Sequence, residues 1–533
     1  MRAAIALALA LFALQPAAAP KLAVIIVVDQ MRADYIDRFQ KDWTGGLKRL
    51  VSGGAVFTNA AYPYLSTVTC AGHATIATGT FPHTHGVILN AWWDRETGAA
   101  MTCTEDRRAT GIGYRTRAAH GDSAWRLHRP TFTDLMRAQR GARVVTLSNK
   151  DRSAIMLAGH GADAVTWLSD SLDGWMTSSV FGDGGPVPAV KAFLEANPIA
   201  NDFGKTWTRL LADSHYPDPD DAPGEAPPRG WTRTFPHVLN GTVNQPDATF
   251  FAQWERSPFA NAYLGRFAAA LVDAFTLGRN SGTDVLGISF SAPDTVGHAF
   301  GPRSVEQRDL YLRLDRTMGE LFDHLDQTVG ADRWIAALSS DHGITPLPEQ
   351  LREEGKDGGR LPASVVAAAI IDRLRTTLKE NAPVAQLAGN DIYFAAGVYD
   401  KLLRSPKALD AVVQTIRDIP GVARVFRAEE LRDPAAARDP LQRAAALGYF
   451  PGRSGDLIMA LKPGWIFAGS GAQHGSAASD DQRVPLVFLG AGVKPGRYGD
   501  QASPADLAPT LASLLGVSMP DVEGRALVAA FAK

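Results

Sequence analysis

The sequence predicts an α/β fold in which a central, mostly parallel sheet is flanked by helices on both faces. Two observations support this class: predicted strands alternate with predicted helices, and the first predicted strand is apolar along nearly its whole length. One long segment interrupts the alternation and predicts an inserted cap subdomain. Alternation is typical of parallel sheets because each crossover between parallel strands usually contains a covering helix.

The first predicted strand, residues 21–30, reads KLAVIIVVDQ. A continuous apolar and β-branched run is the pattern of a central parallel strand that is buried on both sides. Similar runs predict four further strands, at residues 142–148, 284–291, 334–341 and 484–490. Helical periodicity predicts helices at residues 261–277, 305–328, 363–381 and 505–515.

Two segments depart from this pattern. Residues 343–473 form a stretch of 131 residues with its own helix–strand alternation, far longer than a plain crossover, so we expect an inserted cap subdomain at about residues 345–470. Residues 215–230 are rich in proline and aspartate and predict a surface loop. Its aspartates are potential calcium ligands, although a solvated acidic loop is the favoured interpretation: Asp218, Asp220 and Asp221.

Composition and the N-terminus indicate an exported globular protein. Of 533 residues, 45% are apolar and 21% charged, and the net charge of −2 gives no electrostatic support for a nucleic-acid-binding module. Arg2, the apolar run at residues 3–14 and the small residues that follow predict a signal peptide at residues 1–19. We therefore expect residues 20–533 to be periplasmic or secreted, without a membrane anchor; no oligomeric state is predicted.

Three aspartates stand at the ends of predicted strands. Asp29 closes the first strand, Asp294 follows the strand at residues 284–291, and Asp341 closes the strand at residues 334–341. In an open α/β sheet, ligands bind at the carboxyl ends of the strands. The three carboxylates are therefore expected to face one site.

Three histidines accompany these aspartates. His298 follows Asp294 by four residues, His342 is next to Asp341, and His474 lies in a loop rich in small residues. Mixed carboxylate and imidazole ligands suit Zn²⁺, and less specifically Mn²⁺ or Fe. Six candidate ligands exceed what one tetrahedral ion takes, so two ions are predicted.

The ordered motifs VVDQMR, TVTCAGHATIATG, GVILN, SAPDTVGH, SSDHG and AQHG resemble those of the alkaline phosphatase superfamily. The resemblance is greatest to its exported, PafA/PhoK-like phosphate-monoesterase branch, which is related to nucleotide pyrophosphatase/phosphodiesterases. It extends from about residue 21 to the C-terminus and implies an alkaline phosphatase-like domain over residues 20–533 that hydrolyses small-molecule phosphate monoesters. The alternative is a phosphodiesterase, nucleotide pyrophosphatase or phosphonate hydrolase on the same scaffold.

The resemblance also implies residue roles. Two zinc ions would be held by two ligand sets. The first set is Asp294, His298 and His474. The second set is Asp29, Asp341 and His342, completed by the oxygen of the nucleophile, Thr69. Thr69 is the implied nucleophile, which forms a phosphothreonine, because it precedes His73 by four residues at a predicted helix start. The residues alone also allow Ser66, Thr67 and Thr69 to be N-caps. With the ligand positions filled, His73, His83 and His85 are expected to be structural.

We expect the substrate phosphate to be bound by Asn90, Lys150 and Arg152. Lys150 and Arg152 stand two residues apart after a predicted strand, so both side chains are expected on one side, although a solvated strand end is the alternative. Their charge matches a monoester dianion, and Asn90 adds a neutral donor. The two cysteines, Cys70 and Cys103, are equally compatible with one disulfide and with free thiols.

Overall fold

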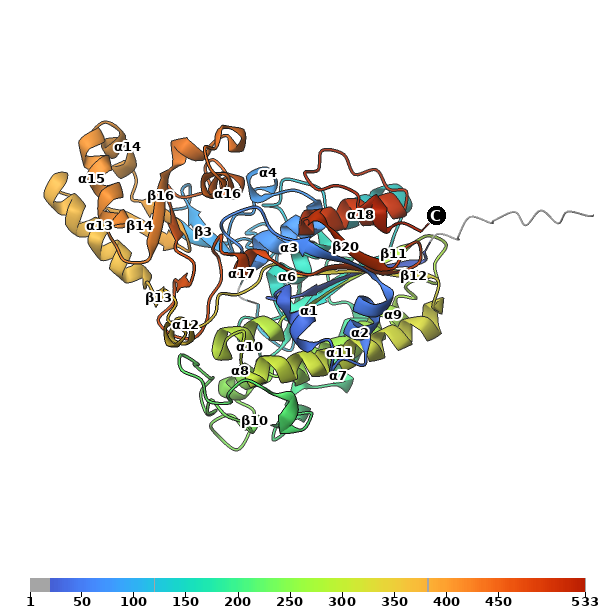
Figure 1. Ribbon diagram of the computed structural model, residues 1–533. Helices are drawn as coiled ribbons and strands as arrows, with labels where there is room; N and C mark the ends of the chain where they lie inside the picture. Colours follow the sequence, from blue (N-terminus) through green and yellow to red (C-terminus); the bar gives the residue numbers. More distant parts are fainter. Residues whose placement is uncertain (1–19, 119, 381–382, 533) are drawn as a thin grey trace, which may run out of the picture.

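The computed structural model describes residues 20–118, 120–380 and 383–532, so the predicted signal peptide lies outside the described residues. The main sheet contains ten strands (Figure 1). Their order across the sheet is β20 (Gly496–Ala502), β2 (Ala55–Ala60), β19 (Leu486–Gly490), β12 (Trp334–Ser339), β1 (Leu22–Val28), β11 (Asp284–Phe290), β6 (Val144–Ser148), β7 (Ala164–Leu168), β8 (Trp175–Ser178) and β5 (Gly111–Tyr114).

The predicted α/β fold is confirmed, and the sheet is mixed. The central strands β12, β1, β11, β6 and β7 run parallel to one another. Towards the two edges, β19 is antiparallel to both of its neighbours, and β8 is antiparallel to β7 and β5. All five strands expected from the sequence are present. Apolar runs report burial rather than direction, which is why the antiparallel pairing of β19 was not predicted.

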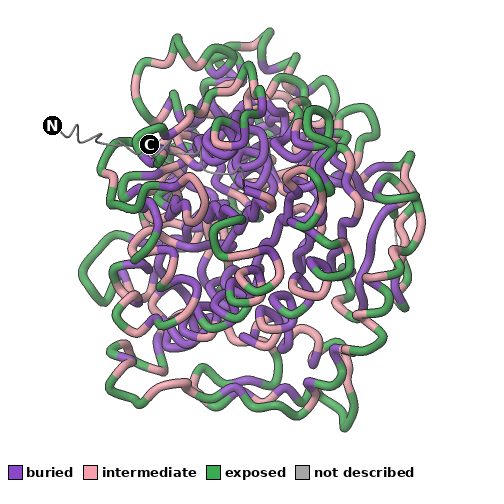
Figure 2. The backbone as a smooth tube through the Cα atoms, turned by 90° about the vertical axis from the view of Figure 1, so that its right-hand side faces the viewer, coloured by how far each residue is buried: buried purple, intermediate pink, exposed green. Residues whose placement is uncertain are grey.

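Helices cover both faces of the sheet. The even-numbered residues of β1, from Leu22 to Val28, pack with α9 (Pro258–Ala274) and α11 (Val305–Leu325). Its odd-numbered residues pack with α3 (Thr69–Thr78) and α6 (Asp151–Ala158) on the other face. Successive side chains of a strand point to opposite faces, so a strand covered on both sides must be apolar throughout. Figure 2 shows the buried residues gathered in the interior beneath exposed loops.

The segment between β12 and β19 has a sheet and a hydrophobic cluster of its own. Its four strands are antiparallel and lie in the order β14 (Val384–Ala388), β15 (Asp391–Phe394), β17 (Leu457–Leu461) and β16 (Val422–Arg427). Helices α13 (Ala363–Thr377) and α15 (Pro406–Arg417) pack on this sheet through residues such as Ile370, Val412 and Met459. In Figure 1 this segment lies to one side of the main sheet.

The remaining predicted helices are found close to their expected positions. The helix expected at residues 505–515 is α18 (Leu507–Leu514), preceded by a short turn of tighter helix. Helix α9 starts three residues earlier than expected because Pro258 occupies its first turn, where a missing N–H costs nothing. Within the described part of the chain, no helix has the length and apolar character that crossing a bilayer requires.

Candidate metal centre

Thr69 is the first residue of α3. Val68 occupies the N-cap position, and no side chain caps this helix. The Thr67 hydroxyl donates instead to the carbonyl oxygen of Ser476 at 3.0 Å. The N-cap alternative is therefore wrong. The Thr69 hydroxyl lies 3.4 Å from His342 Nε2, at the positive end of the helix dipole, where an anion is stabilised.

The three aspartates meet at the carboxyl ends of neighbouring strands. Asp29 directly follows β1, Asp341 follows β12, and Asp294 lies in the first turn of α10 (Ala292–Phe300), after β11. These strands are adjacent and parallel, so their ends share one edge of the sheet. All three side chains are buried, and Asp29 Oδ1 and Asp341 Oδ2 have no hydrogen-bond partner. Buried carboxylate oxygens without a donor fit a cation site.

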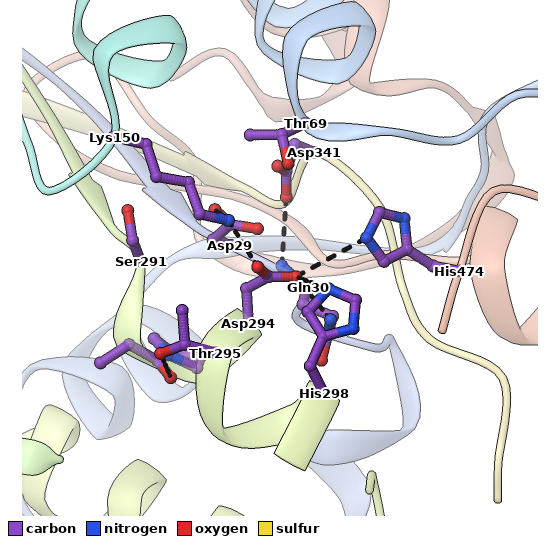
Figure 3. A network of polar contacts seen from close by, with 12 residues as sticks. Asp29, Gln30, Thr69, Lys150, Ser291, Asp294, Thr295, His298, Asp341 and His474 are labelled. Carbon is purple, nitrogen blue, oxygen red and sulfur yellow. Dashed lines mark hydrogen bonds and ion pairs between the residues drawn. The ribbon is translucent and has the colours of Figure 1, made fainter. Parts of the chain in front are cut away.

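The three histidines are held as metal ligands require. In each ring, Nδ1 lies within hydrogen-bond distance of a backbone carbonyl oxygen: His298 with Ala472 at 2.8 Å, His342 with Gly343 at 2.9 Å, and His474 with Thr67 at 2.8 Å. A carbonyl oxygen only accepts, so Nδ1 carries the proton and Nε2 keeps its lone pair. Figure 3 shows His298 and His474 directed at Asp294.

The ligand atoms form two groups that share His342. Two sets of three residues offer atoms within 4.8 Å of one another: Asp29, Asp341 and His342, and Asp294, His342 and His474. His298 Nε2 lies 3.2 Å from Asp294 Oδ1, beside the second group. The rings of His342 and His474 are stacked, with centroids 3.5 Å apart. The structure thus brings all six side chains together, with His342 between the two groups, and their nitrogen and oxygen donors fit zinc.

Burial and neighbouring charges determine the protonation of these groups. Burial raises the pKa of Asp29 well above its ordinary value, and the neighbouring carboxylates add to the shift. Burial opposes ionisation of Asp294 too, but His298 and Lys150 hold the pKa of that carboxyl well below its usual range. Burial and two adjacent imidazoles lower the pKa of His474 well below its usual value. The His474 ring is therefore neutral, which is the form that binds a metal.

Lys150 and Arg152 are held by different contacts. Lys150 precedes α6, and its Nζ lies 2.7 Å from Asp29 Oδ2 and 2.5 Å from Asp294 Oδ2. Arg152 lines the cleft that Thr69 also lines. Neither residue belongs to a strand, because β6 ends at residue 148, so the strand alternation behind the expectation of one shared side does not apply to them.

A cleft of about 370 Å³ opens beside the Thr69 hydroxyl. Its lining includes Asn90, Asp294 and His298. The segment between β12 and β19 contributes seven further lining residues: Ala363, Gly389, Asn390, Phe467, Gln473, His474 and Gly475. Six of the side chains predicted to contact phosphate or metal therefore line one cavity: Thr69, Asn90, Arg152, Asp294, His298 and His474. Four others are not among its lining residues: Asp29, Lys150, Asp341 and His342.

Asn90 is held next to the nucleophile position. Its Oδ1 accepts from the Cys70 backbone N–H at 2.8 Å, which leaves its amide N–H groups as donors for a ligand. Its backbone oxygen accepts from the Cys103 N–H at 2.9 Å. Cys70 and Cys103 form a disulfide with Cα atoms 6.7 Å apart. Of the two alternatives for the cysteines, the disulfide is therefore the one formed. Asn90 lies within the loop that this disulfide closes.

The other histidines lie outside the two ligand groups. His73 contacts the Thr69 carbonyl oxygen and the Ser289 hydroxyl, both at 2.9 Å. His85 contacts the Thr75 hydroxyl at 3.2 Å, and His83 lies 3.1 Å from a glutamate. In the loop at residues 215–230, each aspartate considered for calcium pairs with an arginine, at 3.4, 2.8 and 2.8 Å: Asp218, Asp220 and Asp221.

Two residues beside the site were not predicted from the sequence: Gln30, which contacts a candidate ligand, and Asn390, which lines the cleft. Gln30 donates through Nε2 to Asp294 Oδ1 at 2.5 Å, and its position directly after Asp29 was the available signal. Asn390 donates through Nδ2 to the carbonyl oxygen of Gly475 at 2.7 Å and to the Ser66 hydroxyl at 3.0 Å. No local pattern marks Asn390, because its partners lie in distant segments.

Several known proteins are similar to this chain. A family model described as type I phosphodiesterase / nucleotide pyrophosphatase matches residues 23–480. Alkaline phosphatase PhoV of Synechococcus elongatus is 31% identical over 95% of this chain and 92% of its own length. Alkaline phosphatase PhoK of Sphingomonas sp is 32% identical over 95% of this chain and 91% of its own length.

Solved structures extend the similarity to three dimensions. The crystal structure of wild-type alkaline phosphatase PafA has a TM-score of 0.89 and 29% identity, and the match covers 97% of this chain and 100% of that one. Murine ectonucleotide pyrophosphatase/phosphodiesterase 5, at a TM-score of 0.52 and 13% identity, shares the fold alone. The resemblance recognised in the motifs is confirmed. The chain belongs to the type I phosphodiesterase / nucleotide pyrophosphatase family and is a phosphoric ester hydrolase.

Proposed function

We propose that this chain is a phosphate monoesterase of the alkaline phosphatase type that acts through a phosphothreonine on Thr69 at a two-zinc site. The observation that carries the proposal is the convergence of buried, partly unpartnered carboxylates and imidazoles on one hydroxyl at a helix N-terminus. One ion would bind Asp294, His298 and His474. The other would bind four groups: Asp29, Asp341, His342 and Thr69.

The reaction proceeds in two displacements at phosphorus. The Thr69 oxygen attacks in line, so that the bond from Oγ1 to phosphorus forms while the bond to the leaving oxygen breaks. Water then attacks the phosphothreonine, which releases inorganic phosphate and restores the hydroxyl. Bound divalent ions supply Lewis-acid stabilisation of the attacking and departing oxygens in such sites. The N-terminus of α3 and the Asn90 amide stabilise the charge on the transferring group.

The charge of the site favours a monoester. The positive charge of two zinc ions would be balanced by three aspartates and an ionised Thr69 hydroxyl, so the metal centre itself would be close to neutral. Lys150 and Arg152 then provide net positive charge for a dianion. Arg152 borders the cleft, with a buried Nε that has no partner among the described residues and a guanidinium suited to two phosphate oxygens.

Relatives support this assignment. The solved structures similar to this chain include a PafA variant substituted at one threonine, one asparagine, one lysine and one arginine. This chain has the same residue types with the same spacings of 21 and 2 residues, at Thr69, Asn90, Lys150 and Arg152. The second candidate is a phosphodiesterase, nucleotide pyrophosphatase or phosphonate hydrolase, favoured by the description of the matching family model.

We extend the proposal to the organisation and location of the protein. Residues 20–533 would form one alkaline phosphatase-like domain, and its segment at about residues 345–470 would be a cap that borders the cleft through Asn390 and Phe467. Residues 1–19 would direct export to the periplasm or the medium. The disulfide between Cys70 and Cys103 supports an oxidising compartment. The substrates would be small-molecule phosphate monoesters.

Metal analysis combined with activity measurement tests the proposal. Purified protein should contain two zinc equivalents, and hydrolysis of p-nitrophenyl phosphate should disappear on chelation and return with Zn²⁺. Faster hydrolysis of bis-p-nitrophenyl phosphate would favour the diesterase instead. Acid quenching with a radiolabelled monoester should trap phosphate on the wild-type chain and not on Thr69→Ala. Full activity after exhaustive removal of divalent ions would refute the two-metal mechanism.

A further inference from the structure

Gln30 has a backbone conformation that residues with a side chain rarely adopt. It follows Asp29 at the end of β1, with φ at 67°, in the left-handed region that favours glycine. Such a conformation is strained for a residue with a side chain and persists where surrounding contacts determine it. The side chain is fully buried. The contacts of Gln30 therefore have to account for its conformation.

The backbone of Gln30 orients one ligand group. Its N–H donates to Asp341 Oδ1 at 3.1 Å, and the backbone N–H of His342 donates to the same oxygen at 3.1 Å. With Oδ1 held by two donors, the other oxygen of Asp341 is turned towards the centre. Asp341 Oδ2 lies 3.3 Å from His342 Nε2 and has no hydrogen-bond partner.

The side chain of Gln30 orients the other group. Its Nε2 donates to Asp294 Oδ1 at 2.5 Å (Figure 3). The same oxygen is the one that faces the imidazoles, at 3.2 Å from His298 Nε2 and 3.7 Å from His474 Nε2. One residue thus contacts a carboxylate of each ligand group, through its main chain on one side and its amide on the other.

Gly297 of helix α10 leaves room for this amide. A Cβ atom built on Gly297 would lie 1.8 Å from Gln30 Oε1. Any side chain at Gly297 would therefore displace the glutamine from Asp294, which lies on the same helix one turn earlier. Gly297 and Gln30 are complementary, and the glycine is required by a contact rather than by its own backbone conformation.

We infer that Gln30 is a positioning residue that sets the orientation of Asp341 and Asp294 relative to each other, and so the spacing of the two metal sites. The inference rests on the proposed function, because it concerns the ligands of that centre. Loss of a hydrogen bond to a metal-binding carboxylate typically weakens metal affinity about 10–100-fold.

Zinc binding measured by competition with a chromophoric chelator tests the inference on the full chain. We expect Gln30→Ala to bind at least one zinc equivalent about 10–100-fold more weakly than the wild type. Gln30→Gly relieves the backbone strain but also lacks the amide, so it should bind zinc as weakly as the alanine variant. The matched control is Gln253→Ala, another buried glutamine, which donates to the Arg229 carbonyl oxygen and should bind zinc normally.

The glycine provides the decisive variant. Gly297→Ala should weaken zinc binding in the wild-type background. It should have little further effect when combined with Gln30→Ala, because the new Cβ atom at position 297 then has no glutamine side chain to displace. Wild-type zinc affinity in a folded Gln30→Ala chain would overturn the inference, as would an undiminished effect of Gly297→Ala in the double variant. A wild-type chain that binds no zinc would instead overturn the proposed metal centre itself.

Discussion

Replacing Arg152 by alanine removes one positive charge from the cleft without removing a proposed metal ligand. The guanidinium lies beside Thr69 and Asn90, and its ion pair with Asp151 is long, at 3.3 Å. Loss of the side chain should therefore act mainly on the bound phosphate. If the two basic residues match the charge of a monoester dianion, the loss should be larger for monoesters than for diesters, which carry one charge fewer.

The size of the effect follows from the exposure of the side chain. Removing one donor that stabilises a transferring group costs about 2.7–4 kcal/mol, or roughly 10²–10³-fold in turnover. Arg152 keeps 27% of its side chain exposed, so water screens part of its charge and the lower value applies. We expect kcat/KM for p-nitrophenyl phosphate to fall about 10²-fold, and for the bis-ester about tenfold or less. Adding Lys150→Ala should bring the monoester loss to within about 10²–10⁴-fold.

The assay compares both esters on preparations with equal zinc content. Equal zinc is essential for the double variant because Lys150 contacts Asp29 and Asp294. Arg137→Ala is the matched control, since this exposed arginine lies on helix α5 (Phe132–Arg140) outside the residues that line the cleft. Equal losses on the monoester and the diester would refute the charge-matching argument.

Three further predictions concern other parts of the fold. Asn390→Ala breaks the bonds to Gly475 and Ser66 and should lower kcat about tenfold; an unchanged kcat would limit Asn390 to the folding of its own segment. Replacing Cys70 and Cys103 by alanine opens a loop with a sequence separation of 33 and should lower the free energy of unfolding in urea by about 3–4 kcal/mol; an unchanged midpoint would contradict this. Burial raises the pKa of Glu225 from 4.5 to about 8. The protonated form of Glu225 therefore contributes stability that is fully present below the pKa of this group in the unfolded chain and is lost as pH rises through 8. Glu225→Gln should therefore raise Tm relative to the wild type at pH 9 but not at pH 4, and a Tm difference independent of pH would count against this reasoning.

Local sequence patterns determined the framework of this protein. A parallel strand covered on both faces needs an unbroken apolar run, so β1 and β11 could be located from the sequence. Since parallel strands end at one edge of the sheet, Asp29, Asp294 and Asp341 could be expected together from their positions along the chain. The position of Thr69 at a helix start was implied by the motif that resembles the alkaline phosphatase superfamily.

Only the tertiary structure decided which distant loops meet these strand ends. His474 arrives from a loop 133 residues after Asp341, and Asn390 comes from a separate sheet, so no periodicity encodes either contact. The direction of Lys150 depended on where β6 ends and α6 begins. The left-handed backbone at Gln30 was not predictable either, because the residue is not a glycine. Contacts with two distant carboxylates, rather than local preference, stabilise that conformation.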